Sequence, residues 1–123
     1  HGGGHSVRAF IHIKDVVQAT MQLALEADPG STWHLSTREC HSIRTVVEKI
    51  CELTGSDFED FVQISEDRLG KDQSYLLDST AMRKVHGWSD QTSLSQGLEE
   101  TLAWVDANLT ILNTLPWSYQ HKI

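Results

Sequence analysis

The chain has 123 residues, of which 39% are hydrophobic and 22% charged, and its formal net charge is −7. This length and composition fit one small globular domain with one core, and the acidic balance argues against a nucleic-acid surface or a peripheral membrane anchor. No apolar run approaches the roughly 20 residues of a membrane helix, and the polar start His1–His5 is not a secretory signal. Because the chain lacks an initial methionine and enters a strand-like stretch almost at once, we expect a piece of a longer protein.

The chain alternates strand-like and helical patterns. Val7–Ile13 is rich in β-branched and aromatic residues, which predicts a strand. Asp15 is expected to cap a helix over Val16–Ala27, because a carboxylate accepts the free N–H groups of a first turn. Thr32–Leu35 predicts a second short strand, and Phe61–Ile64 predicts a third extended piece.

Two further helices are predicted from their end signals. Ser42 precedes a stretch with helical apolar spacing, Ile43–Thr54, and Gly55 follows it in the manner of a glycine beyond a helix C-terminus. A short helix is expected over Thr80–His86, because Gly87 supplies a second C-terminal stop of the same kind.

The last predicted helix is the longest. Ser93 and Gln96 form a capping-box pattern, and a leucine-rich stripe follows for about 20 residues until Pro116, which cannot continue a helix. Short strands alternating with about four helices predict an α/β fold class. The strands are too few for a complete doubly wound sheet.

The stretch Glu66–Asp78, which reads EDRLGKDQSYLLD, has the residue types of an anion site. It places the cations Arg68 and Lys71 on either side of Gly70 and then turns into a short apolar run. An arginine binds a phosphate with a planar fork, and a lysine adds a point charge. Arg8, at the head of another strand-like run, offers a second guanidinium. On residue types alone, a solvated surface turn is the alternative.

Other catalytic patterns are weak in this sequence. Cys40 adjoins His41, but no acid that would orient the histidine is evident, and Cys51 beside Ile50 is interpreted as packing. The sequence has no phosphate loop, dinucleotide glycine fingerprint or H-E-x-x-H motif, so it gives no metal or cofactor ligands. Two cysteines without a C-x-x-C motif fit a reducing, cytoplasmic location, with one disulfide between them left open.

Four stretches follow one another in the chain as VRAFIHIKDVVQA, TWHLSTRECHSIRTVVEKI, DRLGKDQSYLLDSTAMRKVHGW and TSLSQGLEETLAWV. In this order they resemble the C-terminal part of the extended short-chain dehydrogenase/reductases, and more narrowly the nucleotide-sugar epimerases and 4,6-dehydratases. The usual family forms are R-D-F-[IV]-x-V-x-D-V, Y-N-[IL]-G, R-P-G-D and L-G-W, followed by S-L-x-x-G. The resemblance covers roughly Gly4 to Val105. Thr37–Arg44 also resembles the T-x-E-x-H-S-[IV]-R stretch of GDP-mannose dehydratases.

The resemblance implies how the work is divided in a full-length enzyme. In that family a Rossmann domain binds NAD(P) and supplies a Tyr-x-x-x-Lys pair, while the C-terminal portion clamps the nucleotide diphosphate of the sugar. Residues 1–123 are therefore expected to form a single substrate-binding domain that binds a nucleotide-diphosphate sugar and itself holds no NAD or NADP. The Rossmann domain is then the partner. Because its absence would uncover apolar surface, we expect the isolated chain either to self-associate, for example as a homodimer, or to be only marginally stable.

The resemblance also implies site residues. Arg8 matches the family's arginine that contacts the diphosphate, and Arg68 matches the arginine of R-P-G, a second contact to the diphosphate or ribose. Lys71 stands where the family has His or Asp beside the nucleotide, and Ser42 where some dehydratases place an Asn near the base. Leu69 departs from the family's proline. No residue is assigned a catalytic role, and a non-catalytic binding or interaction module stays the alternative.

Overall fold

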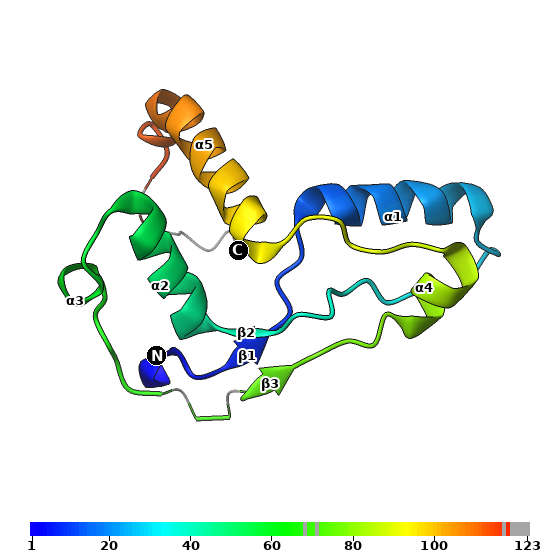
Figure 1. Ribbon diagram of the computed structural model, residues 1–123, viewed down its shortest axis with the longest axis horizontal. Helices are drawn as coiled ribbons and strands as arrows, with labels where there is room; N and C mark the ends of the chain where they lie inside the picture. The colour runs from blue at the N-terminus through cyan, green and yellow to red at the C-terminus, as the bar shows by residue number, and fades with distance from the viewer. Residues whose placement is uncertain (68, 71, 117, 119–123) are drawn as a thin grey trace.

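The computed structural model describes residues 1–67, 69–70, 72–116 and 118. Within these residues the chain forms five α-helices, at Ile13–Glu26 (α1), Ile43–Thr54 (α2), Phe58–Phe61 (α3), Thr80–His86 (α4) and Leu94–Leu112 (α5). A 3-10 turn, η1, covers Gly2–Gly4. Helices α1 and α4 lie at one end of the molecule and α2 and α3 at the other, with a small sheet between them and α5 beside α2 (Figure 1). This mixture of helices and short strands confirms the predicted α/β class.

The sheet consists of three two-residue strands in the order β2-β1-β3, which are Val7–Arg8 (β1), His41–Ser42 (β2) and Ser74–Tyr75 (β3). Strand β2 runs antiparallel to β1, with Arg8 opposite His41. Strand β3 runs parallel to β1, with Arg8 opposite Tyr75. The backbone N–H of Val7 also donates to the carbonyl of Gln73 at 2.9 Å. The central strand therefore joins segments that are far apart in the sequence.

Two strand predictions are wrong in their extent. The predicted strand Val7–Ile13 pairs only over its first two residues, and Thr32–Leu35 is outside the sheet that the described residues form. A strand needs a neighbour to pair with its backbone, whereas a β-branched or aromatic composition reports only a fit to a half-buried pleated surface. Trp33 and Leu35 pack against the hydrophobic core, and no described strand lies beside them.

The prediction that Asp15 caps the first helix is also wrong. Helix α1 begins at Ile13, within the predicted strand, and His12 occupies the N-cap position. Asp15 lies in the first turn and is only 1% exposed. Its carboxylate accepts the backbone N–H groups of Gln91 at 3.0 Å and Thr92 at 3.1 Å. The acid therefore holds a distant loop, because its place in the first turn faces the interior of the molecule.

The caps predicted for two longer helices are confirmed. Ser42 Oγ accepts a backbone N–H from the first turn of α2 at 3.0 Å, and Gly55 ends that helix with a φ of +66°, a conformation that glycine adopts without steric cost. Ser93 Oγ accepts the N–H of Gln96 at 3.3 Å. The Gln96 side chain donates to Glu100, so only half of the capping box forms.

The extended piece predicted at Phe61–Ile64 begins with a helical residue, because α3 includes Phe61. Asp57 Oδ1 accepts the backbone N–H of Glu59 at 3.0 Å and so caps this single helical turn. The cap accounts for Phe61 alone, because Val62 has extended backbone angles, with a φ of −111° and a ψ of +113°. The short helix α4 has the predicted bounds and ends at Gly87.

The buried core is small and lies between α1 and α4. Ala19, Met82 and Trp88 form its buried centre, and four partly buried residues pack against it, namely Ile11, Leu23, Trp33 and Leu35. The opposite face of α1 carries an apolar stripe at four-residue spacing that is more than half exposed, consisting of Ile13, Val17, Met21 and Leu25. Helix α1 is therefore apolar on two sides. In the described part of the chain, no helix has the length and apolar character needed to cross a membrane.

Candidate functional site

Arg8 is the predicted substrate-binding residue with the most informative surroundings. It is half-buried in the central strand, and its guanidinium donates to the carbonyl of Val7 at 2.7 Å and to the carbonyl of Asp72 at 2.8 Å. A guanidinium has five N–H donors, so these two contacts leave further donors for a ligand. No carboxylate of the described residues forms an ion pair with Arg8. Its positive charge is therefore available to an anion.

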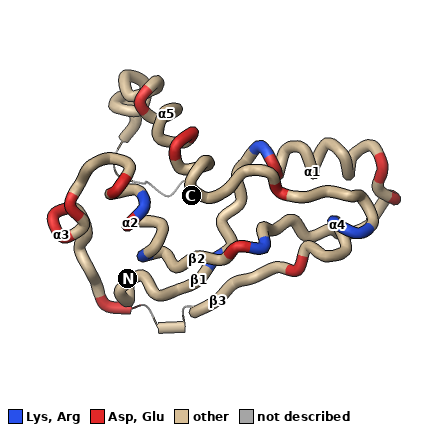
Figure 2. Tube along the Cα trace, viewed as in Figure 1, with Lys and Arg blue, Asp and Glu red and all other residues tan. Residues whose placement is uncertain are grey.

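The contact with Asp72 ties Arg8 to the segment that the sequence singled out as an anion site. Arg68 and Lys71 themselves lie outside the described residues. Between them Gly70 has a φ of +74°, in the left-handed region that favours glycine. The structure thus places Arg8 beside the stretch whose sequence carries two more cations, although Arg8 precedes that stretch by a long way. Acidic residues lie along α3 and α5 (Figure 2).

Two aromatic rings that sequence reasoning did not assign to the site flank Arg8. Residues directly opposite one another in neighbouring strands direct their side chains to the same face of a sheet. His41 is opposite Arg8 on one side and Tyr75 on the other, so the three side chains form one row across the sheet. The His41 side chain is 23% exposed and its Nε2 lies 3.5 Å from a Glu39 carboxylate oxygen. Tyr75 is 62% exposed.

Ser42 lies elsewhere in this arrangement. It is opposite Val7, so alternation along the strand directs its side chain to the face opposite that of Arg8. Its hydroxyl accepts the backbone N–H of Thr45 at 3.0 Å and lies 2.8 Å from the Thr45 hydroxyl. These contacts explain Ser42 as a helix cap, and its contact with substrate stays a prediction.

His41 lines a polar cavity of about 350 Å³. Residues 90–93, which form the loop before α5, and Leu94, the first residue of α5, also line this cavity. Two of its charged side chains are paired with each other, because Arg83 donates to Asp90 at 2.5 Å; Arg83 also donates to the carbonyl of Ser36 at 2.9 Å. Burial opposes ionisation of Asp90, but hydrogen bonds from Arg83 and Thr37 outweigh it and hold the pKa of Asp90 below its usual value. The charges of Arg83 and Asp90 in this cavity therefore belong to a hydrogen-bond network that stabilises the fold.

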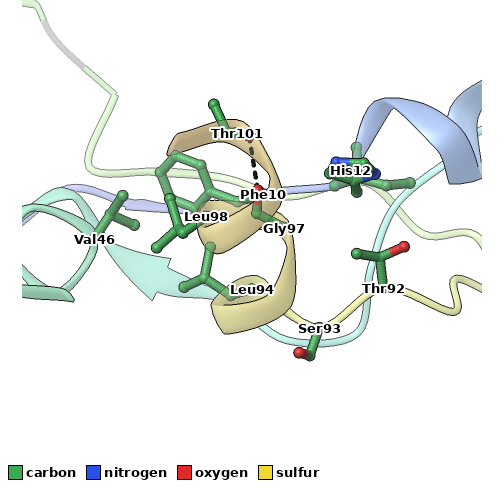
Figure 3. A pocket seen from close by; sticks show the side chains of 10 residues that line it. Phe10, His12, Val46, Thr92, Ser93, Leu94, Gly97, Leu98 and Thr101 are labelled. Carbon is green, nitrogen blue, oxygen red and sulfur yellow. Dashed lines mark hydrogen bonds between the residues drawn. The ribbon is translucent and has the colours of Figure 1, made fainter. Parts of the chain in front are cut away.

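A second cavity, of about 160 Å³, lies between the first turn of α5 and the residues that precede α1. Figure 3 shows the Phe10 ring next to Leu98, with Leu94 close by, and the Thr101 hydroxyl donating to the Gly97 carbonyl at 2.7 Å. A largely apolar cavity of this size does not suit a diphosphate, whose charge needs donors and cations.

The geometry also bears on the other chemistry considered from the sequence. The expectation that no acid orients His41 is wrong, because a Glu39 carboxylate oxygen lies 3.5 Å from its Nε2. In the described part of the chain, no cluster of three or more His, Cys, Asp or Glu side chains could hold a metal ion. The two cysteines are both free, with Cys40 exposed and Cys51 buried. Packing is thus confirmed for Cys51, and the site rests on the Arg8 row.

Comparison with known proteins extends this picture. A family model described as GDP-mannose 4,6 dehydratase matches residues 1–101. The chain is 32% identical over 108 residues to a trifunctional UDP-glucose 4,6-dehydratase/UDP-4-keto-6-deoxy-D-glucose 3,5-epimerase/UDP-4-keto-L-rhamnose-reductase of Arabidopsis thaliana, and this match covers 88% of the chain and 16% of the plant protein.

The solved structures with similar folds include a dehydratase and an epimerase. The dTDP-glucose 4,6-dehydratase of Bacillus anthracis in complex with NAD matches with a TM-score of 0.80 at 25% identity over 89% of this chain and 34% of its own. The UDP-glucose 4-epimerase of Thermotoga maritima with UDP-glucose matches with a TM-score of 0.77 at 26% identity over 88% of this chain and 34% of its own. The chain thus spans about a third or less of the length of these relatives.

Proposed function

The chain belongs to the GDP-mannose 4,6 dehydratase family, and we propose that it is the nucleotide-sugar-binding portion of an NAD(P)-dependent nucleotide-sugar 4,6-dehydratase or epimerase. In this proposal the chain clamps the nucleotide diphosphate of the sugar. Hydride transfer takes place in a further part of the same protein, which binds the cofactor and supplies the catalytic residues.

The observation that carries the proposal is the contact between Arg8 and the backbone of Asp72. This contact sets an arginine without a carboxylate partner among the described residues beside the segment that contains Arg68 and Lys71. A diphosphate carries two or more negative charges, and cations from two separate segments offset them while guanidinium forks fix its position. An acidic protein with a local basic site is selective for such a ligand over a nucleic acid.

The relatives support the class of ligand and cofactor. The Thermotoga maritima epimerase was solved with UDP-glucose, and the Bacillus anthracis dehydratase with NAD. By the same reasoning the cofactor is NAD or NADP, held by a Rossmann domain that is the partner of this chain. The two free cysteines support a reducing, cytoplasmic location for the reaction.

Calorimetric titration of the chain with dTDP-, UDP-, GDP- and CDP-sugars tests this proposal. We expect at least one of them to bind, and the best ligand identifies the nucleotide. Replacing Arg8 and Arg68 together by alanine should weaken that binding by about 100-fold or more, because hydrogen bonds to a charged group contribute about 1.5–3 kcal/mol each.

The control is Lys84→Ala, which removes an exposed cation on α4, a helix apart from the sheet. The control should bind as the unmodified chain does. Absence of binding to all four nucleotide sugars, or equal binding by the double variant and the control, would refute the proposed function.

A further inference from the structure

The glycine turn η1, at Gly2–Gly4, lies against the first turn of α2 (Figure 1). A Cβ atom added to Gly4 would lie 2.9 Å from the backbone nitrogen of Arg44 and 3.2 Å from its Cα. Non-bonded heavy atoms are in optimal contact at about 3.5–4.0 Å, so a side chain at position 4 would push the turn and the helix apart. Gly4 also has a φ of +75°, in the left-handed region that favours glycine. The observed spacing between η1 and α2 therefore requires glycine at this position.

The contact at Gly4 is the first of several between the segment that ends at Arg8 and the start of α2. The carbonyl of Ser6 accepts the backbone N–H of Ile43 at 3.0 Å, and the two residues that follow Ser6 form β1, which pairs with β2. Ser42, the last residue of β2, is the N-cap of α2. Only three residues separate Gly4 from Arg8. The spacing between the turn and α2 therefore bears directly on where the guanidinium lies.

The turn has little freedom to absorb an added side chain by moving elsewhere. The backbone N–H of Gly2 donates to the carbonyl of Ser65 at 2.9 Å, which holds the turn on another side. Helix α2 is itself packed against α3 and α5. Strand β1, by contrast, has two residues and few hydrogen bonds of its own. A displacement caused by a side chain at position 4 would therefore fall on β1 and would move Arg8.

We propose that Gly4 is a positioning residue for the diphosphate that Arg8 binds, because its missing side chain sets the distance between β1 and α2 and so the place of Arg8. This inference rests on the proposed function, and it adds a residue that acts on the ligand through Arg8 without touching it. The hydrogen bonds of a guanidinium to a phosphate depend on aligned donors. A small displacement of β1 therefore weakens them while the fold is kept.

Gly4→Asn tests the inference, because asparagine adopts a left-handed φ more readily than most residues but still carries a Cβ. The matched control is Gly30→Asn. Gly30 has a φ of +83°, and among the described residues no atom beyond its chain neighbours would lie within 4 Å of a Cβ there. Calorimetric titration uses UDP-glucose, dTDP-glucose, GDP-mannose and CDP-glucose as probes, and circular dichroism follows the fold. We expect Gly4→Asn to weaken binding by about 10-fold, equivalent to one hydrogen bond to a charged group, and the control to bind as the unmodified chain does.

Combining the substitution with Arg8→Ala separates positioning from general destabilisation. Arg8→Ala alone should weaken binding by about 10-fold or more. Adding Gly4→Asn should then cause less than about twofold further loss, because the arginine through which Gly4 acts is gone. Additive losses, or equal binding by Gly4→Asn and Gly30→Asn, would overturn the inference while the proposed function stands. Loss of the fold in Gly4→Asn would also overturn it, since Gly4 would then be a requirement for folding. If the unmodified chain binds none of the four nucleotide sugars, the proposed function and the inference fail together.

Discussion

Asp15 is the side chain through which the first helix holds the loop that leads into the last one. It is 1% exposed, and its carboxylate accepts two backbone N–H groups, from Gln91 at 3.0 Å and Thr92 at 3.1 Å. Its own carbonyl accepts the indole N–H of Trp88 at 3.2 Å. Removing the carboxylate would leave two backbone donors of this loop without their partner.

We expect Asp15→Ala to lower the free energy of unfolding by about 3 to 5 kcal/mol, because each hydrogen bond to a charged group contributes about 1.5–3 kcal/mol. That is a large share of the roughly 5–15 kcal/mol by which most domains are stable. Asp15→Asn keeps one acceptor oxygen in a side chain of the same shape, so we expect it to cost about half as much.

Urea denaturation followed by circular dichroism measures these differences. Asp106→Ala is the control, since Asp106 is an exposed acid on α5 with no hydrogen-bond partner among the described residues. The control should stay within about 0.5 kcal/mol of the unmodified chain. If Asp15→Ala behaves like the control, the two hydrogen bonds do not hold the loop, and the reasoning from burial is refuted.

Two further predictions concern pH and association. Burial opposes the ionisation of Asp90, but hydrogen bonds still hold its pKa below the usual value. The carboxylate therefore stabilises the fold at pH values above the unfolded pKa of about 4. This stabilisation is lost as the pH falls through the pKa of the folded state. The difference in urea midpoint between the chain and Asp90→Asn should therefore be present at about pH 6 and shrink below about pH 4, and a difference independent of pH would contradict this. The exposed apolar stripe on α1 predicts that the chain self-associates. Analytical ultracentrifugation should show a shift toward the monomer in the double variant Val17→Lys, Met21→Lys but not in the control Thr110→Lys on α5. A monomeric unmodified chain would exclude self-association through this stripe.

Helix positions could be predicted from the sequence because their signals are local. Ser42 and Gly55 bound α2 as expected, and Ser93 starts α5, since a cap is made by a residue and the helical turn next to it. The family was recognisable for a related reason, because its motifs are short and keep their order along the chain. Such features need no knowledge of how distant segments meet.

Strand pairing and the site could not be predicted in this way. Thr32–Leu35 has a strand-like composition, but the residues that pair with β1 are the polar His41–Ser42 and Ser74–Tyr75. Asp15 was assigned to its own helix because the loop that it holds lies far along the sequence. Tyr75 was seen only as the start of an apolar run, since nothing local shows that it lies opposite Arg8. Each of these relations depends on a contact between distant segments.

The pairing of the distant strands nevertheless depends on helix ends that the local sequence determines. Ser42 is at once the last residue of β2 and the N-cap of α2, so the helix that it caps fixes where His41 lies relative to Arg8. On the other side of the sheet, β3 leads into α4 through Ser79, whose buried hydroxyl donates to the carbonyl of Ser36 at 2.9 Å. Two-residue strands supply few hydrogen bonds of their own, so the capped helix α2 and the contact between Ser79 and Ser36 must hold the row in register. The proposed binding of a diphosphate at Arg8 would therefore depend on Ser42 through the position of β2, whether or not the Ser42 hydroxyl touches the substrate.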